Sequence, residues 1–469
     1  MRGILAVIGL VFAFAVQANV PRGTIESFID REMPASGTPG LAYAVVQAGA
    51  DKKAGARGVK RAGGEAAITP DTPFITGSIS KSFTALAVMQ LVEAGKIDLD
   101  AEISQYLAEF SGQPAGTITI RQLLSHTSGF STYQGNVSHT EGSQGGEVFA
   151  QQAAAIATLT PAYAPGTRWE YSNQNYKILG RLIEVVSGQS FIGYITGNIL
   201  EPVGMRNSFV SDGKDHAEMA TGHRPWFGSK RPLARNSTHL ATAPQGGIVA
   251  SASDLALYMQ TMMNGEDDIL SAEGKAAMMS PASDISPNYG FGWFLDPDDG
   301  TVFHSGASPG FETLLTMVPA EQKGAAVLVN AGSGIGFGES IELRNGITAR
   351  AIGLDYNGEG SRFWQKAMFV GLALLPVLYL VSMVWAWRHR AQLRAKSGAS
   401  GLFSLWFPLL TTIGAAVFLL VFVPQIFAAS LPTIGLFQPD TGLAIVAAAA
   451  LGVLWAIFRL GVVYTKPAK

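Results

Sequence analysis

The sequence has no cysteine among its 469 residues, and only 14% of them are charged. Without cysteine the chain forms no disulfide bond, whichever compartment it occupies. Disulfides are not needed for stability, because about 340 residues lie between the two ends of the chain and can bury a sizeable core. The net charge of −2 is close to neutral and gives no electrostatic basis for binding nucleic acid, so no nucleic-acid partner is predicted.

The low charge also indicates contact with lipid. Globular chains usually carry about 25% charged residues, whereas this chain has few and is 48% apolar. Three apolar stretches of about the length that spans a bilayer lie near the C-terminus, at about 367–387, 402–427 and 441–463. We therefore predict a transmembrane region over 361–469. The centres of its spans have no ionisable residue of the kind that marks transport paths, which favours an anchor in the lipid bilayer over a transporter.

Basic residues around these stretches predict how they cross the membrane. Between the first and second stretch the chain carries Arg388, His389, Arg390, Arg394 and Lys396, and near its end it carries Arg459, Lys466 and Lys469. The connection between the second and third stretch has no Lys or Arg. The positive-inside rule then places both basic segments in the cytoplasm and the residues before about 360 outside it.

The N-terminus predicts the same orientation. Arg2 supplies a positive charge, 4–16 is a short apolar core, and small residues around Ala18 suit cleavage, so 1–18 is predicted to be a signal peptide. The alternative is an uncleaved anchor helix, and with either reading the soluble part crosses a membrane. We expect a protein of the bacterial inner membrane with its catalytic domain in the periplasm and its C-terminus in the cytoplasm.

Residues 19–360 form the predicted soluble domain. Strand patterns occur near its start, at 41–46 and 55–60, and again near its end, between 290 and 330. The later strands follow one another at hairpin spacing, which predicts an antiparallel sheet. Helix patterns and long loops fill the region from about 99 to 235 between them. The expected fold is α/β (α+β): an antiparallel sheet flanked by helices, with an all-helical insertion subdomain.

The first segment with chemical potential is Ser78-Ile79-Ser80-Lys81. If a helix begins at Ser78, its side chain and that of Lys81 lie on one face and can meet. A serine hydroxyl is a weak nucleophile at neutral pH, but a nearby amine kept neutral by burial can take its proton. A four-residue match is weak by itself, since a capping serine followed by a solvated lysine has the same pattern.

Two further segments strengthen this interpretation. The first, Tyr171-Ser172-Asn173, precedes a helix pattern. A phenol such as that of Tyr171 can relay a proton if cations lower its pKa. Asn173 could bind a substrate amide. Phe303-His304-Ser305-Gly306 ends a strand pattern, where a strand edge can pair with an extended substrate. Taken alone, the first is read equally well as an ordinary turn and the second as a hairpin end.

Together these segments carry a family resemblance. Their order and spacing resemble class C β-lactamases and the related penicillin-binding proteins, esterases and D-amino-acid peptidases, over roughly 22–355. The segments that match are 76–84 (TGSISKSFT), 123–129 (LLSHTSG), 171–176 (YSNQNY), 246–248 (GGI) with 253–255 (SDL), 290–293 (GFGW) and 304–311 (HSGASPGF).

The resemblance implies a role for each matching residue. Ser78 would be the acylated nucleophile, Lys81 its activating partner, and Tyr171 the base and proton relay. Asn173, His304 and Ser305 would bind and orient the substrate. The backbone N–H groups of Ser78 and Ala307 would form the oxyanion hole.

One departure from the family pattern concerns His304, which stands where true β-lactamases commonly have lysine. An unperturbed histidine is mostly neutral at pH 7, whereas lysine is cationic. Recognition of the penicillin carboxylate should therefore be weaker. Histidine at this place is familiar among the esterase-like and peptidase-like members.

The membrane tail narrows the expectation. A signal sequence, this hydrolase domain and three C-terminal spans together resemble the periplasmic peptidase that matures colibactin and similar prodrug-activating peptidases, which remove an acyl-D-asparagine cap. The leading expectation is a peptidase or amidase, with a D-amino-acid preference, acting on a small molecule or short peptide. A carboxylesterase or weak β-lactamase of the same fold is the alternative. In another class, an acylated β-lactam sensor or a binding protein could signal through the tail, although the 388–396 loop leaves no room for a signalling domain.

No cofactor and no metal are predicted. The histidines show neither the H-E-x-x-H motif nor a paired spacing typical of metal ligands. We interpret His126 as a structural histidine near the end of a helix at Gly129.

Overall fold

The computed structural model describes residues 23–50, 52–137 and 147–465, so the predicted signal peptide lies outside the described residues. The described chain divides into two compact units. One holds the residues up to 334 together with 338–360. The other holds 361 onward together with the short segment 335–337.

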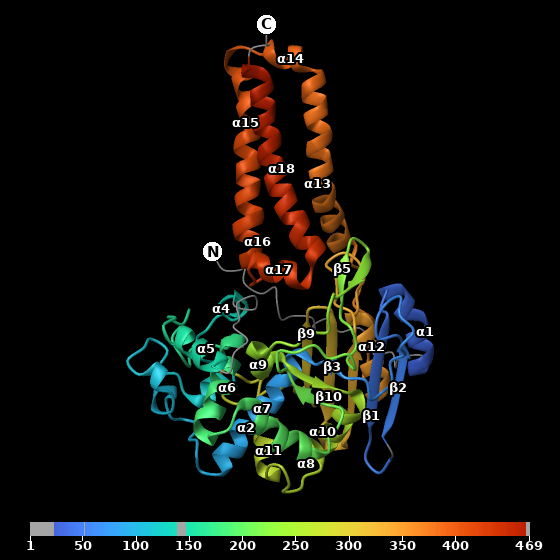
Figure 1. Ribbon diagram of the computed structural model, residues 1–469, viewed down its shortest axis with the longest axis vertical. Coiled ribbons are helices and arrows are strands. Elements are labelled where there is room, and N and C mark those ends of the chain that lie inside the picture. The colour runs from blue at the N-terminus through green and yellow to red at the C-terminus, as the bar shows by residue number, and fades with distance from the viewer. Residues whose placement is uncertain (1–22, 51, 138–146, 466–469) are drawn as a thin grey trace. The chain divides into compact units, whose positions relative to one another are not determined.

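A six-stranded antiparallel sheet organises the first unit, in the order β2-β1-β11-β10-β9-β8. Figure 1 labels β1, β2, β9 and β10 of this sheet. Its strands are β1 (Gly40–Val46), β2 (Lys53–Gly58), β8 (Phe294–Asp296), β9 (Thr301–Ser308), β10 (Phe311–Val318) and β11 (Lys323–Val329). The first two strands come from the start of the domain and the other four from its end. This confirms the predicted antiparallel sheet built from both ends of the domain.

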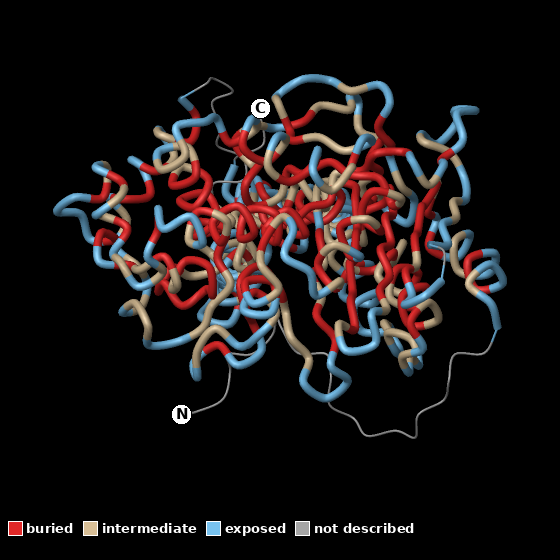
Figure 2. Tube along the Cα trace, turned by 90° about the horizontal axis from the view of Figure 1, so that it is seen from below, coloured by how far each residue is buried: buried red, intermediate tan, exposed pale blue. Residues whose placement is uncertain are grey.

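The two faces of the sheet bury different side chains, because neighbours along a strand point to opposite faces. Leu41 and Tyr43 of β1, with Val327 and Val329 of β11, pack in one cluster with residues of helices α1 (Ile25–Ser36) and α12 (Ile341–Ile352). The intervening alanines and leucine, Ala42, Ala44, Ala326 and Leu328, belong to the larger core on the other side. Figure 2 shows this buried core running through the middle of the unit, with exposed residues along the outer loops.

Helices α2 to α8 follow one another between strands β3 and β4, as the helical insertion requires. The remaining helices of this unit are α2 (Ser80–Glu93), α3 (Ile120–Leu124), α4 (Thr132–Val137), α5 (Val148–Ala157), α6 (Asn173–Ser187), α7 (Phe191–Ile195), α8 (Glu201–Val203), α9 (Ala243–Gly246), α10 (Ala252–Met263) and α11 (Ala272–Met278). Small sheets join β3 (Phe74–Ile75), β7 (Ile248–Ala250) and β4 (Phe209–Val210), and pair β5 (His223–Trp226) with β6 (Ser229–Pro232).

The second unit contains three helices long and apolar enough to cross a membrane. They are α13 (Phe363–Arg388), the run of α15 (Gly398–Val417) into α16 (Val423–Ile426), and α18 (Pro439–Tyr464). Short helices α14 (Arg390–Arg394) and α17 (Leu431–Phe437) connect them. These helices coincide with the three predicted spans and indicate that the protein associates with a membrane.

Candidate active site

Ser78 lies at the start of a helix, where the sequence pattern predicted it. A single 3₁₀ turn, Gly77–Ile79, leads directly into α2. Helix α2 begins at Ser80, so Lys81 lies in its first turn and is fully buried. The Nζ atom of Lys81 lies 3.1 Å from the Oγ atom of the half-buried Ser78.

The surroundings of Lys81 favour a neutral amine. Its Nζ donates to Oδ1 of Asn173 and to the carbonyl of Gln245, each at 2.8 Å. Burial lowers the pKa of Lys81 well below its ordinary value, and the nearby charge of Lys177 lowers it further. A neutral amine uses two N–H groups for Asn173 and Gln245, which leaves its lone pair free to accept the Ser78 hydroxyl proton.

Tyr171 faces the same pair of side chains. The Nζ of Lys81 lies 4.9 Å from the centre of the Tyr171 ring. The phenolic oxygen is buried without a hydrogen-bond partner among the described residues, yet Ser78 is near enough to lower its pKa. Burial outweighs that effect and raises the pKa of Tyr171 above its ordinary value. The condition under which the phenol would act as a base, a pKa lowered by neighbouring cations, is therefore not met, because the effect of burial dominates.

The Ala307 N–H is directed away from the neighbouring strand β10. A two-residue turn joins β9 to β10, with Ser308 opposite Phe311 and Gly306 opposite Thr313. In such a hairpin the pair next to the turn is hydrogen-bonded, so Ala307, one residue further, points its N–H outward. On that outer edge β8 pairs with β9 only as far as Phe303, and Ala307 is exposed. Its N–H can serve a substrate oxyanion.

Two glycines allow the 3₁₀ turn that contains Ser78 to lie close to strand β9. Gly77 has a left-handed φ of 57°, and a Cβ there would lie 2.7 Å from the Ala307 nitrogen. A Cβ on Gly306 would lie only 1.9 Å from the carbonyl oxygen of Thr76. Side chains at these positions would force the two segments apart. The two glycines thus allow the backbone next to Ser78 to lie against the backbone of Ala307.

His304 is buried beside the site with its ring nitrogens engaged. Its Nδ1 lies 2.7 Å from the Ser305 carbonyl and its Nε2 lies 3.2 Å from the Tyr289 hydroxyl. The carbonyl can only accept, so Nδ1 carries the proton and Nε2 accepts from Tyr289. Burial, with the proximity of Lys81, lowers the pKa of His304 to about 3. The imidazole is therefore uncharged at neutral pH.

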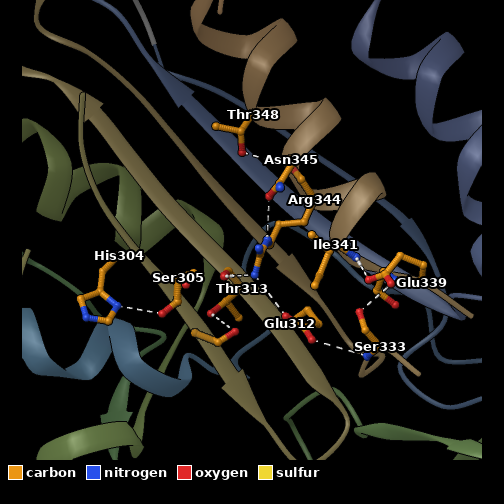
Figure 3. Close-up of polar contacts among 12 residues, drawn as sticks. His304, Ser305, Glu312, Thr313, Ser333, Glu339, Ile341, Arg344, Asn345 and Thr348 are labelled. Atoms are coloured by element: carbon orange, nitrogen blue, oxygen red, sulfur yellow. Dashed lines mark hydrogen bonds and ion pairs between the residues drawn. The ribbon is translucent and has the colours of Figure 1, made fainter. Parts of the chain in front are cut away.

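An ion pair on the opposite face of the sheet supports β10 (Figure 3). Arg344 of α12 donates to the carboxylate of Glu312 and to the backbone carbonyl of Thr313, both at 3.1 Å. The Thr313 hydroxyl in turn donates to the Thr76 carbonyl at 2.7 Å. These contacts connect α12 through β10 to the segment just before Ser78.

Sequence patterns did not identify three residues that contact the site residues. Gln245 contributes only a backbone carbonyl, which leaves no side-chain signature. Tyr289 directly precedes the Gly-Phe-Gly-Trp segment. Asn136 accepts at 2.9 Å from the Asn173 amide, and Oδ1 of Asn173 accepts from Lys81, so protein partners fix the orientation of this side chain. In the described parts of the chain, no three His, Asp or Glu residues gather where they could hold a metal ion.

Comparison with known proteins identifies the family. Residues 25–348, well over half of the chain, match the family described as Beta-lactamase. The chain belongs to the beta-lactamase family. Among curated members it is 32% identical over 321 residues to penicillin-binding protein 4 of Amycolatopsis lactamdurans, covering 64% of this chain and 82% of that protein. It is 27% identical over 325 residues to protein flp of Staphylococcus aureus, covering 67% of this chain. The match spans only 64% of the length of protein flp.

Solved structures of the beta-lactamase fold agree. The octameric penicillin-binding protein homologue from Pyrococcus abyssi superposes with a TM-score of 0.61 at 26% identity, covering 71% of this chain and 77% of that one. A class C beta-lactamase (TM-score 0.58, 22% identity, 69% and 94% covered) and a D-stereospecific amidohydrolase from Streptomyces (0.53, 24%, 66% and 95%) share the fold. The protein is thus a member of the beta-lactamase family of serine hydrolases, to which penicillin-binding proteins also belong.

Proposed function

We propose that this protein is a membrane-anchored serine hydrolase that acts through an acyl-enzyme on Ser78 and cleaves amide bonds in small acylated amino acids or short peptides. The observation that carries the proposal is a fully buried amine 3.1 Å from a solvent-accessible serine hydroxyl at a helix start. That pairing supplies both a nucleophile and a group able to deprotonate it.

The first half-reaction forms the acyl-enzyme. The Ser78 Oγ attacks the substrate carbonyl carbon, and its proton passes to the lone pair of Lys81. The carbonyl oxygen becomes an oxyanion that accepts from the N–H groups of Ser78 and Ala307. Because its raised pKa keeps the Tyr171 phenol protonated, we assign it the role of donor to the leaving amine. Tyr171 takes the Lys81 proton as it gives up its own, and the bond to the amine breaks.

The second half-reaction returns the enzyme to its starting state. A water molecule replaces the departed amine and gives a proton through Tyr171 to the neutral Lys81. The resulting hydroxide attacks the ester carbon, and Ser78 leaves with the proton that Lys81 returns. The products are a carboxylic acid and the regenerated hydroxyl, so each proton taken in one half is restored in the other.

The neutral ring of His304 restricts the substrate class. With a pKa of about 3 and both nitrogens engaged, it offers no positive charge to a carboxylate at neutral pH. This argues against efficient turnover of penicillins, whose carboxylate needs a cation. The open edge of β9 instead favours an extended substrate whose backbone pairs with it.

We also propose that the hydrolase domain faces the periplasm from the bacterial inner membrane, with the C-terminus in the cytoplasm. The support is the distribution of Lys and Arg around the three spans. The membrane tail then keeps the enzyme beside substrates that are exported across that membrane.

A substrate panel tests the activity directly. Purified full-length protein in detergent is assayed with acyl-D- and acyl-L-amino-acid p-nitroanilides, p-nitrophenyl esters and nitrocefin, alongside Ser78→Ala. We expect anilide hydrolysis that exceeds nitrocefin hydrolysis and is lost in Ser78→Ala. Turnover of esters alone would favour a carboxylesterase. Equal turnover by Ser78→Ala with every substrate would reject the proposed function.

A further inference from the structure

His126 holds both neighbours of Tyr171, although it lies more than forty residues earlier in the chain. Its backbone carbonyl accepts from the Glu170 N–H at 2.9 Å. Its ring Nδ1 accepts from the Ser172 N–H at 3.1 Å. The residue that presents the phenol is therefore clamped on each side by one histidine.

The imidazole also fixes the phenol ring itself. The two ring centres lie 4.2 Å apart with a 36° tilt between their planes. On its other sides the imidazole contacts Tyr289 and Tyr176, with ring centres 4.9 and 5.4 Å away. The ring of Tyr171 therefore rests on a side chain that is itself enclosed by aromatic groups.

The protonation state of the His126 imidazole follows from these contacts. A backbone N–H can only donate, so Nδ1 is an acceptor and the proton resides on Nε2. The ring is neutral, in agreement with a pKa lowered well below its ordinary value by burial and by the neighbouring Lys81 and His304. Histidine at this position can accept from Ser172 only while it stays neutral.

Two features of His126 are unfavourable for stability alone. Its backbone is left-handed, with φ at 61°, a conformation that costs energy for a residue with a Cβ. Its Nε2 is buried without a hydrogen-bond partner among the described residues, which leaves a polar group unsatisfied. A residue selected only for packing would avoid both costs.

We propose that His126 is a positioning residue that aims the phenol of Tyr171 at Ser78 and Lys81. This inference rests on the proposed role of Tyr171 as proton relay. His126 is fully buried, so its side chain offers no exposed surface to a substrate. Its removal should therefore slow the chemical steps while leaving substrate binding unchanged, and so lower kcat without a matching change in KM.

The variants follow from the two features of the residue. His126→Gly relieves the left-handed backbone but removes both the acceptor and the ring. His126→Asn tolerates the same backbone and returns an acceptor for the Ser172 N–H. Gln322→Gly is the matched control, because Gln322 also has a left-handed φ, 47°, and lies in the turn between β10 and β11.

The assay is p-nitrophenyl acetate hydrolysis by the full-length protein in detergent, with folding checked by circular dichroism. We expect His126→Gly to lower kcat about 10- to 100-fold with KM within about twofold, since small misplacements of a catalytic group cost this much. His126→Asn should recover part of the loss, and Gln322→Gly should match the wild type. A wild-type kcat in folded His126→Gly would overturn the inference.

A double-mutant cycle distinguishes positioning of Tyr171 by His126 from a general disturbance of the active-site structure. If His126 acts through Tyr171, adding His126→Gly to Tyr171→Phe should slow the enzyme no further. An equal additional loss in that background would contradict positioning. If the glycine variant does not fold, the same cycle with His126→Asn gives the same two outcomes. Full activity of Tyr171→Phe would instead refute the relay in the proposed function, whatever the histidine variants show.

Discussion

At the scale of single residues, the chemistry depends on where burial puts protons. Lys81 is buried, close to another lysine, and disposed to be neutral. Tyr171 is buried beside it, and its pKa is raised rather than lowered. The same physical cause, loss of water around a titratable group, thus makes the amine the stronger candidate for first proton acceptor and keeps the phenol a donor.

Replacing Lys81 with arginine tests this assignment. A guanidinium stays protonated at every accessible pH, so Lys81→Arg keeps a long basic side chain but removes the proton acceptor. We expect kcat/KM for p-nitrophenyl acetate to fall about 10²- to 10⁴-fold. Circular dichroism distinguishes this from misfolding. Activity within twofold of the wild type would exclude Lys81 as the base.

His304 gives a prediction about pH. Since its pKa is about 3, the ring is neutral throughout the range from pH 5 to pH 9 and gains no proton there. A fall of kcat/KM on the acid side of that range should therefore not come from protonation of His304. His304→Gln should therefore keep the shape of the pH–rate profile. A wild-type inflection near pH 6.5 that vanishes in His304→Gln would show that the histidine titrates.

The residues of the site were largely predictable, but their surroundings were not. Ser78, Lys81 and Tyr171 occur in short segments with a recognisable order, and the structure brings all three together. The direction of the Tyr171 pKa could not be predicted, because the sequence does not show how completely a ring is enclosed. The acceptor for Lys81 at Gln245 was missed because any residue can supply a backbone carbonyl.

At the scale of helices and strands, periodicity predicted the sheet well. The strand pattern at 41–46 located β1 to within one position, and the patterns between 290 and 330 cover β9, β10 and β11. The helix expected around Ser78 is present as a 3₁₀ turn over Gly77–Ile79 that continues into α2 at Ser80. Its first turn carries the small polar side chains of Ser80 and Ser82. They are buried there by tertiary contacts, such as the hydrogen bond from the Ile248 N–H to the Ser80 hydroxyl at 2.8 Å.

The ion pair behind the sheet gives a prediction at this scale. Glu312 and Arg344 are both largely buried, so removing one partner leaves an uncompensated charge. Arg344→Met should destabilise the folded state by about 3–5 kcal/mol, whereas Glu312→Leu combined with Arg344→Met should cost much less. Chemical denaturation of the three proteins measures the difference. A double variant no more stable than Arg344→Met would show that an uncompensated Glu312 charge is not the cause of the loss.

At the scale of the whole molecule, composition alone indicated a soluble domain joined to a membrane tail. The charge-free runs predicted three spans, and three apolar helices are found there. The direction in which they cross rests on the positive-inside rule, which reads Lys and Arg counts in the connecting segments. Side-chain contacts within the protein carry no information about that direction.

The absence of cysteine makes the orientation simple to measure. A single cysteine introduced at Ala66 reports on the hydrolase domain and one at Ala391 on the basic loop, and both positions are exposed. In spheroplasts, a membrane-impermeant maleimide should label Ala66→Cys, and should label Ala391→Cys only after lysis. Labelling of Ala391→Cys in intact spheroplasts would reverse the proposed orientation.

The most direct test of the chemistry is to trap the acyl-enzyme site. Full-length wild-type protein and Ser78→Ala are incubated in detergent with a fluorophosphonate, and the adduct is mapped by peptide mass spectrometry. We predict one adduct on Ser78 in the wild type, none in Ser78→Ala, and slower labelling in Lys81→Arg. An unmodified Ser78, or an adduct on a different residue with hydrolysis intact in Ser78→Ala, would contradict a serine nucleophile activated by a buried amine.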